Sequence, residues 1–357
     1  MATLTNPIGM NVWETSHAIA AGQDCSYFVD NEGNVWACGL NHKLQLGIGE
    51  RTSKFKPEKV PGLSDIYSIN CCSFDTSFFF GNFNEVFSAP DSTYANHTTR
   101  QLNVPPANGK IYNICGNRNI FYYLNSAGDI VNEKTTKVAV ANRNFKFLTI
   151  NKAVLARNLY CLDEEGSVYT VPARGIDHGS PVATKMENLP EIDFIAAGTD
   201  HVMFLDKNGG VWAMGESIEG QLGIGSSRKI TEIVQVPEIP PMQFISCGHS
   251  FTLLLDKAGK VWGCGKNESG QLGLSHGRMV VSPCAIDPFP ELVMVSAGSK
   301  HSLFLDKRGV VWAAGSNSAG ALGRNDCADS IFPLELRTLP PVHVVQTASK
   351  IKNARFV

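Results

Sequence analysis

The sequence has no long apolar run and no excess of charge of one sign. Of its 357 residues, 43% are apolar and 18% are charged, with 31 basic and 33 acidic side chains. No stretch approaches the roughly 18 apolar residues of a membrane span. The apolar content and the small net charge of -2 argue against intrinsic disorder and against a strongly basic nucleic-acid-binding chain. We therefore expect a large core and no membrane segment.

Targeting and cofactor motifs are missing as well. The first nine residues lack the basic and apolar regions of a secretory signal, and the last five lack a prenylation cysteine. The ten cysteines form no Cys-x-x-Cys pair and have no matching His spacing, so we interpret them as free thiols. No nucleophile, base and acid set emerges, which argues against a metabolic enzyme and predicts no cofactor. These absences predict a monomeric protein of the cytoplasm, the nucleus or both.

Self-comparison shows that the chain is built from an internal repeat. The segment from Gly198 to Gly209 recurs from Gly298 to Gly309 with the shared pattern His-x-x-Phe-Leu-Asp-Lys-x-Gly. A Val-Trp pair and a Gly-Gln-Leu-Gly-like turn follow in each strong copy. The tryptophans that mark the phase are Trp36, Trp212, Trp262 and Trp312. In the middle of the chain Phe87, Val131 and Tyr169 occupy the same phase, which gives seven repeats.

Within one repeat, short apolar runs alternate with turn residues, and no 3.6-residue period is present. Residues 244–245, 252–255 and 261–262 form three such runs, and Asp256 to Gly259 has the composition of a hairpin turn. Proline is poorly tolerated inside a sheet, so the Pro-Pro pair at 240–241 marks the end of a unit. About four strands in each of seven units predict an all-β fold, a seven-bladed β-propeller of four-stranded antiparallel blades.

We expect residues 1–357 to form one propeller domain. The repeats are placed at about 10–63, 64–110, 111–144, 145–191, 192–241, 242–291 and 292–341. Residues 342–357 follow the last repeat, and residues 340–345 match the opening strand at 240–245. This extra strand either closes the ring near the N-terminal segment or belongs to a chain cut from a longer one. Closure is attractive because an open propeller leaves sheet edges unpaired.

The repeat resembles that of the regulator of chromosome condensation family, whose signature combines a small-Gly step, a His-containing strand, Gly-x-Val-Trp and Gly-Gln-Leu-Gly. The resemblance is strongest in repeats 1, 5, 6 and 7 and extends over almost the whole chain when the weaker repeats are included. It implies a seven-bladed propeller. The family includes a guanine-nucleotide exchange factor for the Ran GTPase that also docks on nucleosomes, and interaction domains associated with ubiquitin ligases or kinases.

Several conspicuous residues have a structural interpretation beside the functional one. Cys247 and Cys115 fall where other repeats have alanine, and Cys264 where they have methionine or alanine, which favours packing over metal or redox chemistry. His201 and His301 share a position that Phe251 fills in another copy, so a buried, hydrogen-bonded histidine is favoured over a metal ligand. The repeat tryptophans are interpreted as core residues. The Gly-Gln-Leu-Gly segments lack the Lys-Ser/Thr step of a phosphate loop and are interpreted as turns.

One position carries a specific functional hypothesis. In the family's exchange factor, an acidic residue just before the strand histidine contributes to the GTPase-binding face. The resemblance therefore implies a partner-binding, exchange-face role for Asp200, with Asp24 and Lys300 at the same position in repeats 1 and 7. The alternative is that Asp200 only caps a turn.

Charge is unevenly distributed along the chain. Residues 105–160 contain only two acidic residues and carry +6, so the remainder carries -8. The basic residues of this segment are Lys110, Arg118, Lys134, Lys137, Arg143, Lys146, Lys152 and Arg157. Of these, Lys134, Lys137, Arg143 and Lys146 are our candidates for contact with an acidic protein or nucleic acid. The alternative is a solvated surface. Nucleic acid is the less favoured partner, because residues 1–17 contain no Lys or Arg.

Two classes of function follow from the sequence. The first is a protein-interaction propeller that binds and regulates a Ran-type GTPase by nucleotide exchange. The second is a non-catalytic scaffold in signalling, trafficking or ubiquitin transfer. The second gains support because the family's exchange factors insert a hairpin wedge into one blade, and no such insertion is visible here.

Overall fold

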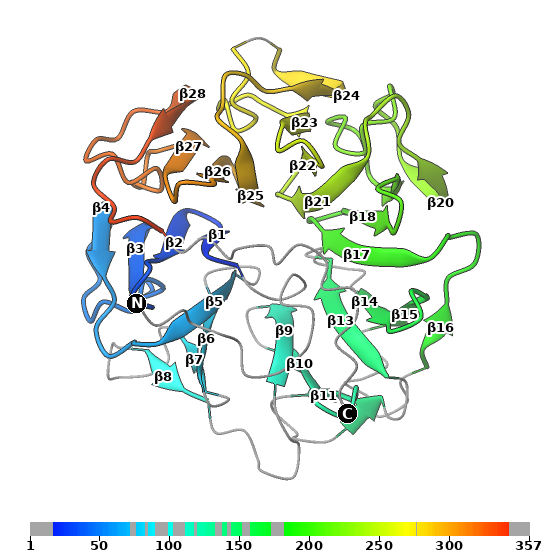
Figure 1. Cartoon of the computed structure of the whole chain (residues 1–357), viewed down its shortest axis with the longest axis horizontal. Helices are drawn as coiled ribbons and strands as arrows, with labels where there is room; N and C mark the ends of the chain where they lie inside the picture. The colour runs from blue at the N-terminus through cyan, green and yellow to red at the C-terminus, as the bar shows by residue number, and fades with distance from the viewer. Residues whose placement is uncertain are drawn as a thin grey trace, which may run out of the picture.

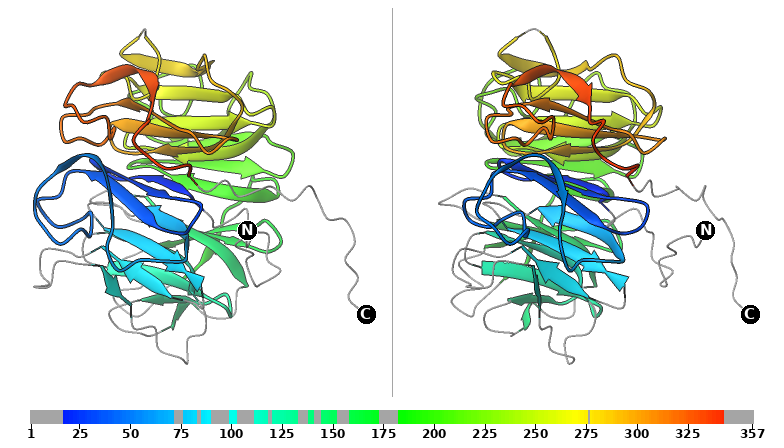
Figure 2. Two further views of the ribbon diagram at one scale, coloured as in Figure 1. Left: turned by 60° about the vertical axis from the view of Figure 1, so that its left-hand side comes forward. Right: turned by 90° about the vertical axis from the view of Figure 1, so that its left-hand side faces the viewer.

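The chain forms a ring of seven antiparallel sheets. The computed structural model describes residues 17–71, 76–82, 85–89, 99–102, 111–117, 120–132, 138–140, 144–151, 158–172, 182–275 and 277–342. These residues contain 28 strands in seven four-stranded sheets and no α-helix, and so no helix that could span a membrane. The sheets surround a common axis, and the first strand of each lies nearest to it (Figures 1 and 2). The predicted seven-bladed β-propeller is confirmed.

Each blade runs from the axis to the rim in chain order. Blade 1 contains β1 (Ile19–Ala21), β2 (Cys25–Val29), β3 (Val35–Gly39) and β4 (Lys54–Lys59); blade 2 contains β5 (Ile66–Cys71), β6 (Ser77–Gly81), β7 (Val86–Ser88) and β8 (Arg100–Gln101). Blade 3 contains β9 (Ile111–Asn117), β10 (Ile120–Asn125), β11 (Ile130–Asn132) and β12 (Val138–Val140); blade 4 contains β13 (Phe145–Ile150), β14 (Asn158–Asp163), β15 (Val168–Pro172) and β16 (Thr184–Lys185). Blade 5 contains β17 (Ile192–Ala197), β18 (His201–Asp206), β19 (Val211–Gly215) and β20 (Ile230–Gln235); blade 6 contains β21 (Met242–Cys247), β22 (Phe251–Asp256), β23 (Val261–Lys266) and β24 (Met279–Ala285). Blade 7 contains β25 (Leu292–Ala297), β26 (His301–Asp306), β27 (Val311–Gly315) and β28 (Ser330–Glu335).

Burial decreases from the middle of each blade to its rim. The second strands β18, β22 and β26 are buried at every position, because neighbouring blades cover both of their faces. The outermost strands have mixed burial, and three of them contain a proline: Pro57, Pro283 and Pro333. Proline is tolerated there because one edge of a rim strand has no neighbouring strand to accept its N–H. The separating Pro-Pro pairs are therefore not the only prolines that the repeat accommodates.

A buried carboxylate closes the hairpin between the second and third strands. In blade 5, Asp206 Oδ1 accepts the backbone N–H groups of Asn208 and Gly210, each at 2.9 Å, and Oδ2 accepts Trp212 Nε1 at 3.0 Å. Asp30 and Asp256 make the same three contacts in blades 1 and 6. Burial alone would raise the pKa of Asp30, but the hydrogen bonds, led by that from Trp36, outweigh it and lower the pKa. We call this arrangement the aspartate latch.

The latch changes where the tryptophan is absent. Blade 4 has Tyr169 at the tryptophan position, and Asp163 accepts the N–H of Ser167. Blade 3 has Val131 there, and Asn125 Oδ1 serves as the acceptor for its turn. The strand registers place these residues opposite the same second-strand position as Trp212, so the phases assigned to the weak repeats are correct. A second carboxylate oxygen is dispensable where no indole N–H needs it.

Blade 7 contains a variant of the latch. Arg308 donates from Nε and Nη2 to Asp306 Oδ2 at 3.0 and 2.8 Å. The Nε1 of Trp312 is buried and has no hydrogen-bond partner within the described part of the chain. The guanidinium has thus taken the oxygen that the indole uses in the other strong blades.

The segment after blade 7 returns to blade 1. Val342 is buried and pairs with Asp30 in an isolated antiparallel bridge, and its N–H donates to Gly309 O at 3.0 Å. Ile192, Met242 and Leu292 occupy the corresponding place opposite the latch residue in blades 5 to 7. Val342 therefore supplies the first position of the inner strand of blade 1, and β1 supplies the later ones. Residues 343–357 lie outside the described residues.

We expect Asp206→Ala to lower the free energy of unfolding by about 2–4 kcal/mol, because the change removes a buried carboxylate that accepts three hydrogen bonds. Urea unfolding followed by circular dichroism measures this. Glu232→Ala, which removes an exposed acid from β20 of the same blade, should stay within about 0.5 kcal/mol of wild type. Equal effects of the two changes would contradict the latch.

Arg308→Ala should behave differently from other deletions of a charge-assisted contact. Its loss frees Asp306 Oδ2 for the indole of Trp312, so we expect a change of no more than about 0.5 kcal/mol in unfolding free energy. The same urea titration tests this, and a loss of about 2 kcal/mol would show that Trp312 does not replace the arginine.

Candidate functional site

In blades 5, 6, 7 and 1 the turns between first and second strands follow one another in an arc at one end of the central channel. We call residues 22–24, 198–200, 248–250 and 298–300 the turn ring. A Cβ added to Gly198 would lie 2.6 Å from Gly248 O, one on Gly248 2.6 Å from Gly298 O, and one on Gly298 2.6 Å from Gly22 O. The small-Gly step of the repeat is therefore required by backbone contact between adjacent blades. Two interblade bonds, His249 N–H to Gly298 O and Ser299 N–H to Gly22 O, reinforce the ring.

The turn ring carries the three repeat-position candidates. Asp24, Asp200 and Lys300 occupy equivalent places, and their backbone carbonyls accept the N–H groups of Leu40, Glu216 and Ser316, each at 2.8 Å. These bonds hold the loops between third and fourth strands beside the turns, on the same face. Asp24 is half-buried, whereas Asp200 and Lys300 are exposed. The structure thus places the three side chains on one face, on blades 1, 5 and 7.

The surroundings of Asp200 are of mixed charge. Lys229 pairs with Glu216 at 2.7 Å, and this hydrogen bond, together with the nearby Asp200, raises the pKa of Lys229. In the next blade, Lys266 pairs with Glu219 at 3.2 Å and with Glu268 at 2.9 Å. The Asp200 carboxylate makes no hydrogen bond within the described residues. Asp200 is exposed to solvent.

The histidines after these turns are structural. His201 and His301 are buried, and their Nε2 atoms lie 3.1 Å from Thr252 Oγ1 and 3.0 Å from Ser26 Oγ in the next blade. The hydroxyls in turn donate to the carbonyls of Gln221 and Ala321. Hydrogen bonds through a hydroxyl thus join blades 5 and 7, which contain these histidines, to the next blade. The prediction that both histidines are buried and hydrogen-bonded is confirmed.

The Gly-Gln-Leu-Gly segments connect neighbouring blades. A Cβ on Gly220 would lie 2.7 Å from Val280 O, and one on Gly270 2.4 Å from Ile331 Cα, both in the outermost strand of the next blade. Their glycines have positive φ, 81° and 77° at these two positions. They are turns packed against a neighbouring sheet, as predicted, and not phosphate loops.

Six of the described cysteines are buried, whereas Cys71 and Cys284 are half-buried and Cys327 is exposed. Cys38, Cys161 and Cys264 are fully buried, and burial raises the pKa of each thiol well above its ordinary range. Cys247 corresponds to the alanine step as expected, but Cys115 pairs with Tyr122 and so lies one position earlier in its strand than the sequence alignment predicted. No group of His, Cys, Asp or Glu in the described part of the chain could hold a metal ion.

The basic segment is described only in part. Lys146 lies on β13, is largely buried, and approaches Asp193 of blade 5 at 4.0 Å. This contact gives Lys146 a partner within the propeller. The other candidates, Lys134, Lys137 and Arg143, lie outside the described residues, so their contact with a partner stays a prediction.

The sequence did not reveal the charged loop residues around Asp200. Glu216, Glu219 and Lys229 come from the loop between the third and fourth strands of blade 5, and Lys266 ends β23 at the position in blade 6 that corresponds to Glu216. The repeat contained one indirect signal. The backbone carbonyl at the Asp200 position accepts the N–H of the residue 16 positions later, so that residue lies beside Asp200.

The fold is a propeller built from repeats, and the face that carries the turn ring exposes both acidic and basic side chains. The sequence profile described as Regulator of chromosome condensation (RCC1) repeat matches residues 32–74, 208–255 and 258–305. A second profile of the same description matches residues 243–271 and 294–321. These segments of the chain therefore carry RCC1-type repeats.

Solved structures show the same fold. Prp20p from Saccharomyces cerevisiae has a TM-score of 0.74 at 17% identity, covering 94% of this chain and 90% of that chain. Yeast RCC1 (Prp20) bound to Kap60 gives 0.72 at 16% identity with the same coverage. Human WBSCR16 gives 0.51 at 17% identity, covering 90% and 82%. No curated protein sequence matches the chain.

His301→Phe, which copies Phe251 of blade 6, should make the fold less sensitive to acid. Burial lowers the pKa of His301 to about 4, against an ordinary value of about 6.5. Between these values the unfolded chain takes up a proton that the folded chain does not. Wild-type unfolding free energy should therefore fall as the pH drops from about 6.5 to about 4, by up to about 3 kcal/mol from this group.

Urea unfolding at about pH 7 and pH 4.5 measures the difference. It should be smaller in His301→Phe and unchanged in His42→Asn, which alters an exposed histidine. The same acid-induced loss in wild type and His301→Phe would show that His301 is not held neutral.

Proposed function

We propose that this propeller is a protein-interaction module whose turn-ring face binds and regulates a Ran-type small GTPase. The exchange-face residue is Asp200, and Asp24 and Lys300 extend the contact to neighbouring blades. We further propose that the protein acts in the nucleus, the cytoplasm or both. The proposal needs no cofactor and no second catalytic group.

The single observation that carries the proposal is the exposed carboxylate of Asp200 on a rigid turn. The Gly198 N–H bonds to His201 O at 2.9 Å, and the Asp200 carbonyl bonds to Glu216 N–H, so both sides of the turn are fixed. A carboxylate held in this way approaches a partner with little loss of conformational entropy. Against a nucleotide site it would compete with phosphate for Mg²⁺ and cationic side chains, which weakens nucleotide binding.

The similar yeast structures support a protein partner. Prp20p was studied for its binding to Gsp1p and histones, and yeast RCC1 (Prp20) was solved bound to Kap60. The identities of 16% and 17% are too low to transfer these partners. They make a GTPase the first partner to test.

A non-catalytic adaptor is the second candidate. Lys300 replaces the acid in blade 7, so the turn ring does not repeat the acidic feature around the channel. A face that mixes acids and bases in this way suits the recognition of one protein surface without any chemistry at the nucleotide.

A nucleotide-release assay tests the first candidate. Purified protein should accelerate release of a fluorescent guanine nucleotide from Ran, and Asp200→Ala should reduce the acceleration by at least about tenfold, as expected for an interfacial charge. Glu165→Ala removes an exposed acid from a hairpin at the opposite end of the strands and should leave the rate unchanged.

The same samples separate the two candidates when binding to Ran is measured in parallel. Binding that depends on Asp200 without faster release would support the adaptor. If Ran neither binds nor releases nucleotide faster, GTPase regulation through this face is wrong.

A further inference from the structure

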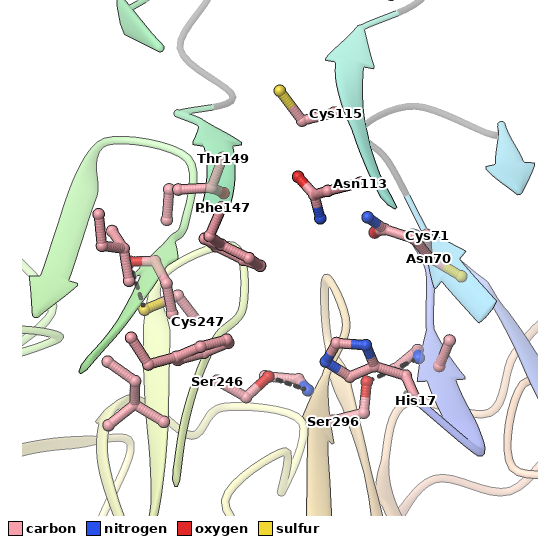
Figure 3. Close-up of a pocket in the computed structure, with 18 of the residues that line it drawn as sticks. His17, Asn70, Cys71, Asn113, Cys115, Phe147, Thr149, Ser246, Cys247 and Ser296 are labelled. Carbon is pink, nitrogen blue, oxygen red and sulfur yellow. Dashed lines mark hydrogen bonds between the residues drawn. The ribbon is translucent and has the colours of Figure 1, made fainter. Parts of the chain in front are cut away.

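The central channel contains a cavity that the turn-ring hypothesis does not use. Its volume is about 140 Å³, and all seven inner strands contribute to its wall. Figure 3 shows side chains from opposite sides of the ring, among them His17, Asn70, Asn113 and Phe147, facing this space. A cavity of roughly 150 Å³ in another protein holds a benzene molecule, so this one has the size of a single ring.

One side of the cavity is an arc of aromatic rings. Phe147, Phe194 and Phe244 each lie opposite the leucine that precedes a latch residue, so they share one inner-strand position in blades 4 to 6. Neighbouring ring centroids are 5.0 and 5.1 Å apart, and His17 continues the arc at 6.0 Å from Phe244. The phenylalanine rings are tilted by 45° and 32° to one another and line the cavity, so they offer aromatic surface to a planar guest.

The opposite side presents amides whose orientation the backbone fixes. Leu148 N–H donates to Asn113 Oδ1 at 3.3 Å, so the oxygen of that amide is committed and its Nδ2 is left as a donor. Asn70 Nδ2 donates to Ile114 O at 2.7 Å, so Oδ1 is left as an acceptor. Within the described residues, Asn113 Nδ2 and Asn70 Oδ1 have no hydrogen-bond partner. They are also not among the buried polar atoms that lack a partner, so they are accessible. Both therefore face the accessible space of the channel.

Hydroxyl groups on the inner strands of blades 4, 6 and 7 add further polar atoms to the wall. Ser246 Oγ accepts Ala297 N–H at 3.0 Å, and Ser296 Oγ accepts Ala21 N–H at 2.9 Å. Each bond fixes an oxygen and leaves its hydroxyl hydrogen for another acceptor. Thr149 lies at the inner-strand position that corresponds to these serines, and Figure 3 shows it at the cavity beside Phe147. Donors and one acceptor thus converge on the space that the rings flank.

We propose that this cavity binds a small, neutral, planar heteroaromatic ring that carries a hydrogen-bonding edge such as a carboxamide. The phenylalanines stack on the ring, Asn113 Nδ2 and the serine hydroxyls donate to its acceptors, and Asn70 Oδ1 accepts its N–H. Neutrality follows from the wall, in which no Asp, Glu, Lys or Arg side chain takes part among the described residues. The proposal is independent of the GTPase hypothesis.

Ligand-observed NMR titration of the full chain tests the proposal with nicotinamide as the probe and toluene as its apolar counterpart. We expect nicotinamide to bind at least about tenfold more tightly than toluene, because two or more hydrogen bonds distinguish them. Asn113→Asp keeps the acceptor for Leu148 N–H and replaces the donor, so it should weaken nicotinamide binding by about tenfold or more.

Thr149→Val and Phe194→Leu test the hydroxyl group and the aromatic arc separately. The first removes only a hydroxyl and should weaken binding by about threefold, and the second interrupts the arc and should weaken it by about tenfold. Lys260→Ala, an exposed change away from the channel, should bind as wild type. Three results would each overturn the proposal. The first is that neither probe saturates below about 10 mM, and the second is that toluene binds as tightly as nicotinamide. The third is that Asn113→Asp and Thr149→Val bind nicotinamide as wild type does.

Discussion

The propeller depends on the acidic side chain that ends the second strand of its strong blades. Asp30, Asp206 and Asp256 each satisfy two backbone N–H groups of the hairpin and the indole N–H of the third strand. The aspartate side chains themselves are buried, so a carboxylate left without these donors would cost more than an exposed hydrogen bond contributes. The acid therefore fixes the hairpin and the tryptophan together, and the third strand takes its register from both.

Once the blades are formed, small residues decide how they meet. Gly198, Gly248 and Gly298 approach the next glycine carbonyl so closely that no side chain fits, and the Gly-Gln-Leu-Gly turns pack against the rim strand of the following blade. His201 and His301 then cross the same junctions through a hydroxyl. Contacts near the axis and at the rim fix the angle between neighbouring blades, which makes the turn face a rigid surface.

The repeat period was enough to predict the seven-bladed fold. Phe87, Val131 and Tyr169 could be assigned to the tryptophan phase because a hairpin needs only an apolar residue there once the indole is gone, and the registers agree. The alignment failed by one residue at Cys115, because Asn117, and not Gly116, occupies the position of the repeat glycine in blade 3. The latch was visible as a repeated Leu-Asp step, but its three partners become evident only in three dimensions.

The cavity in the central channel could not be predicted from the repeat pattern. Identical repeats line an axis with identical residues, and such a wall can recognise little beyond size. Asn70, Asn113 and Thr149 come from blades 2 to 4, whose repeats have diverged, whereas Phe194, Phe244 and the serines come from the strong blades. The asymmetry of the cavity thus arises from the departures from the repeat. Because an ordered polar and aromatic wall requires such departures, the weak blades are where specificity is most easily built.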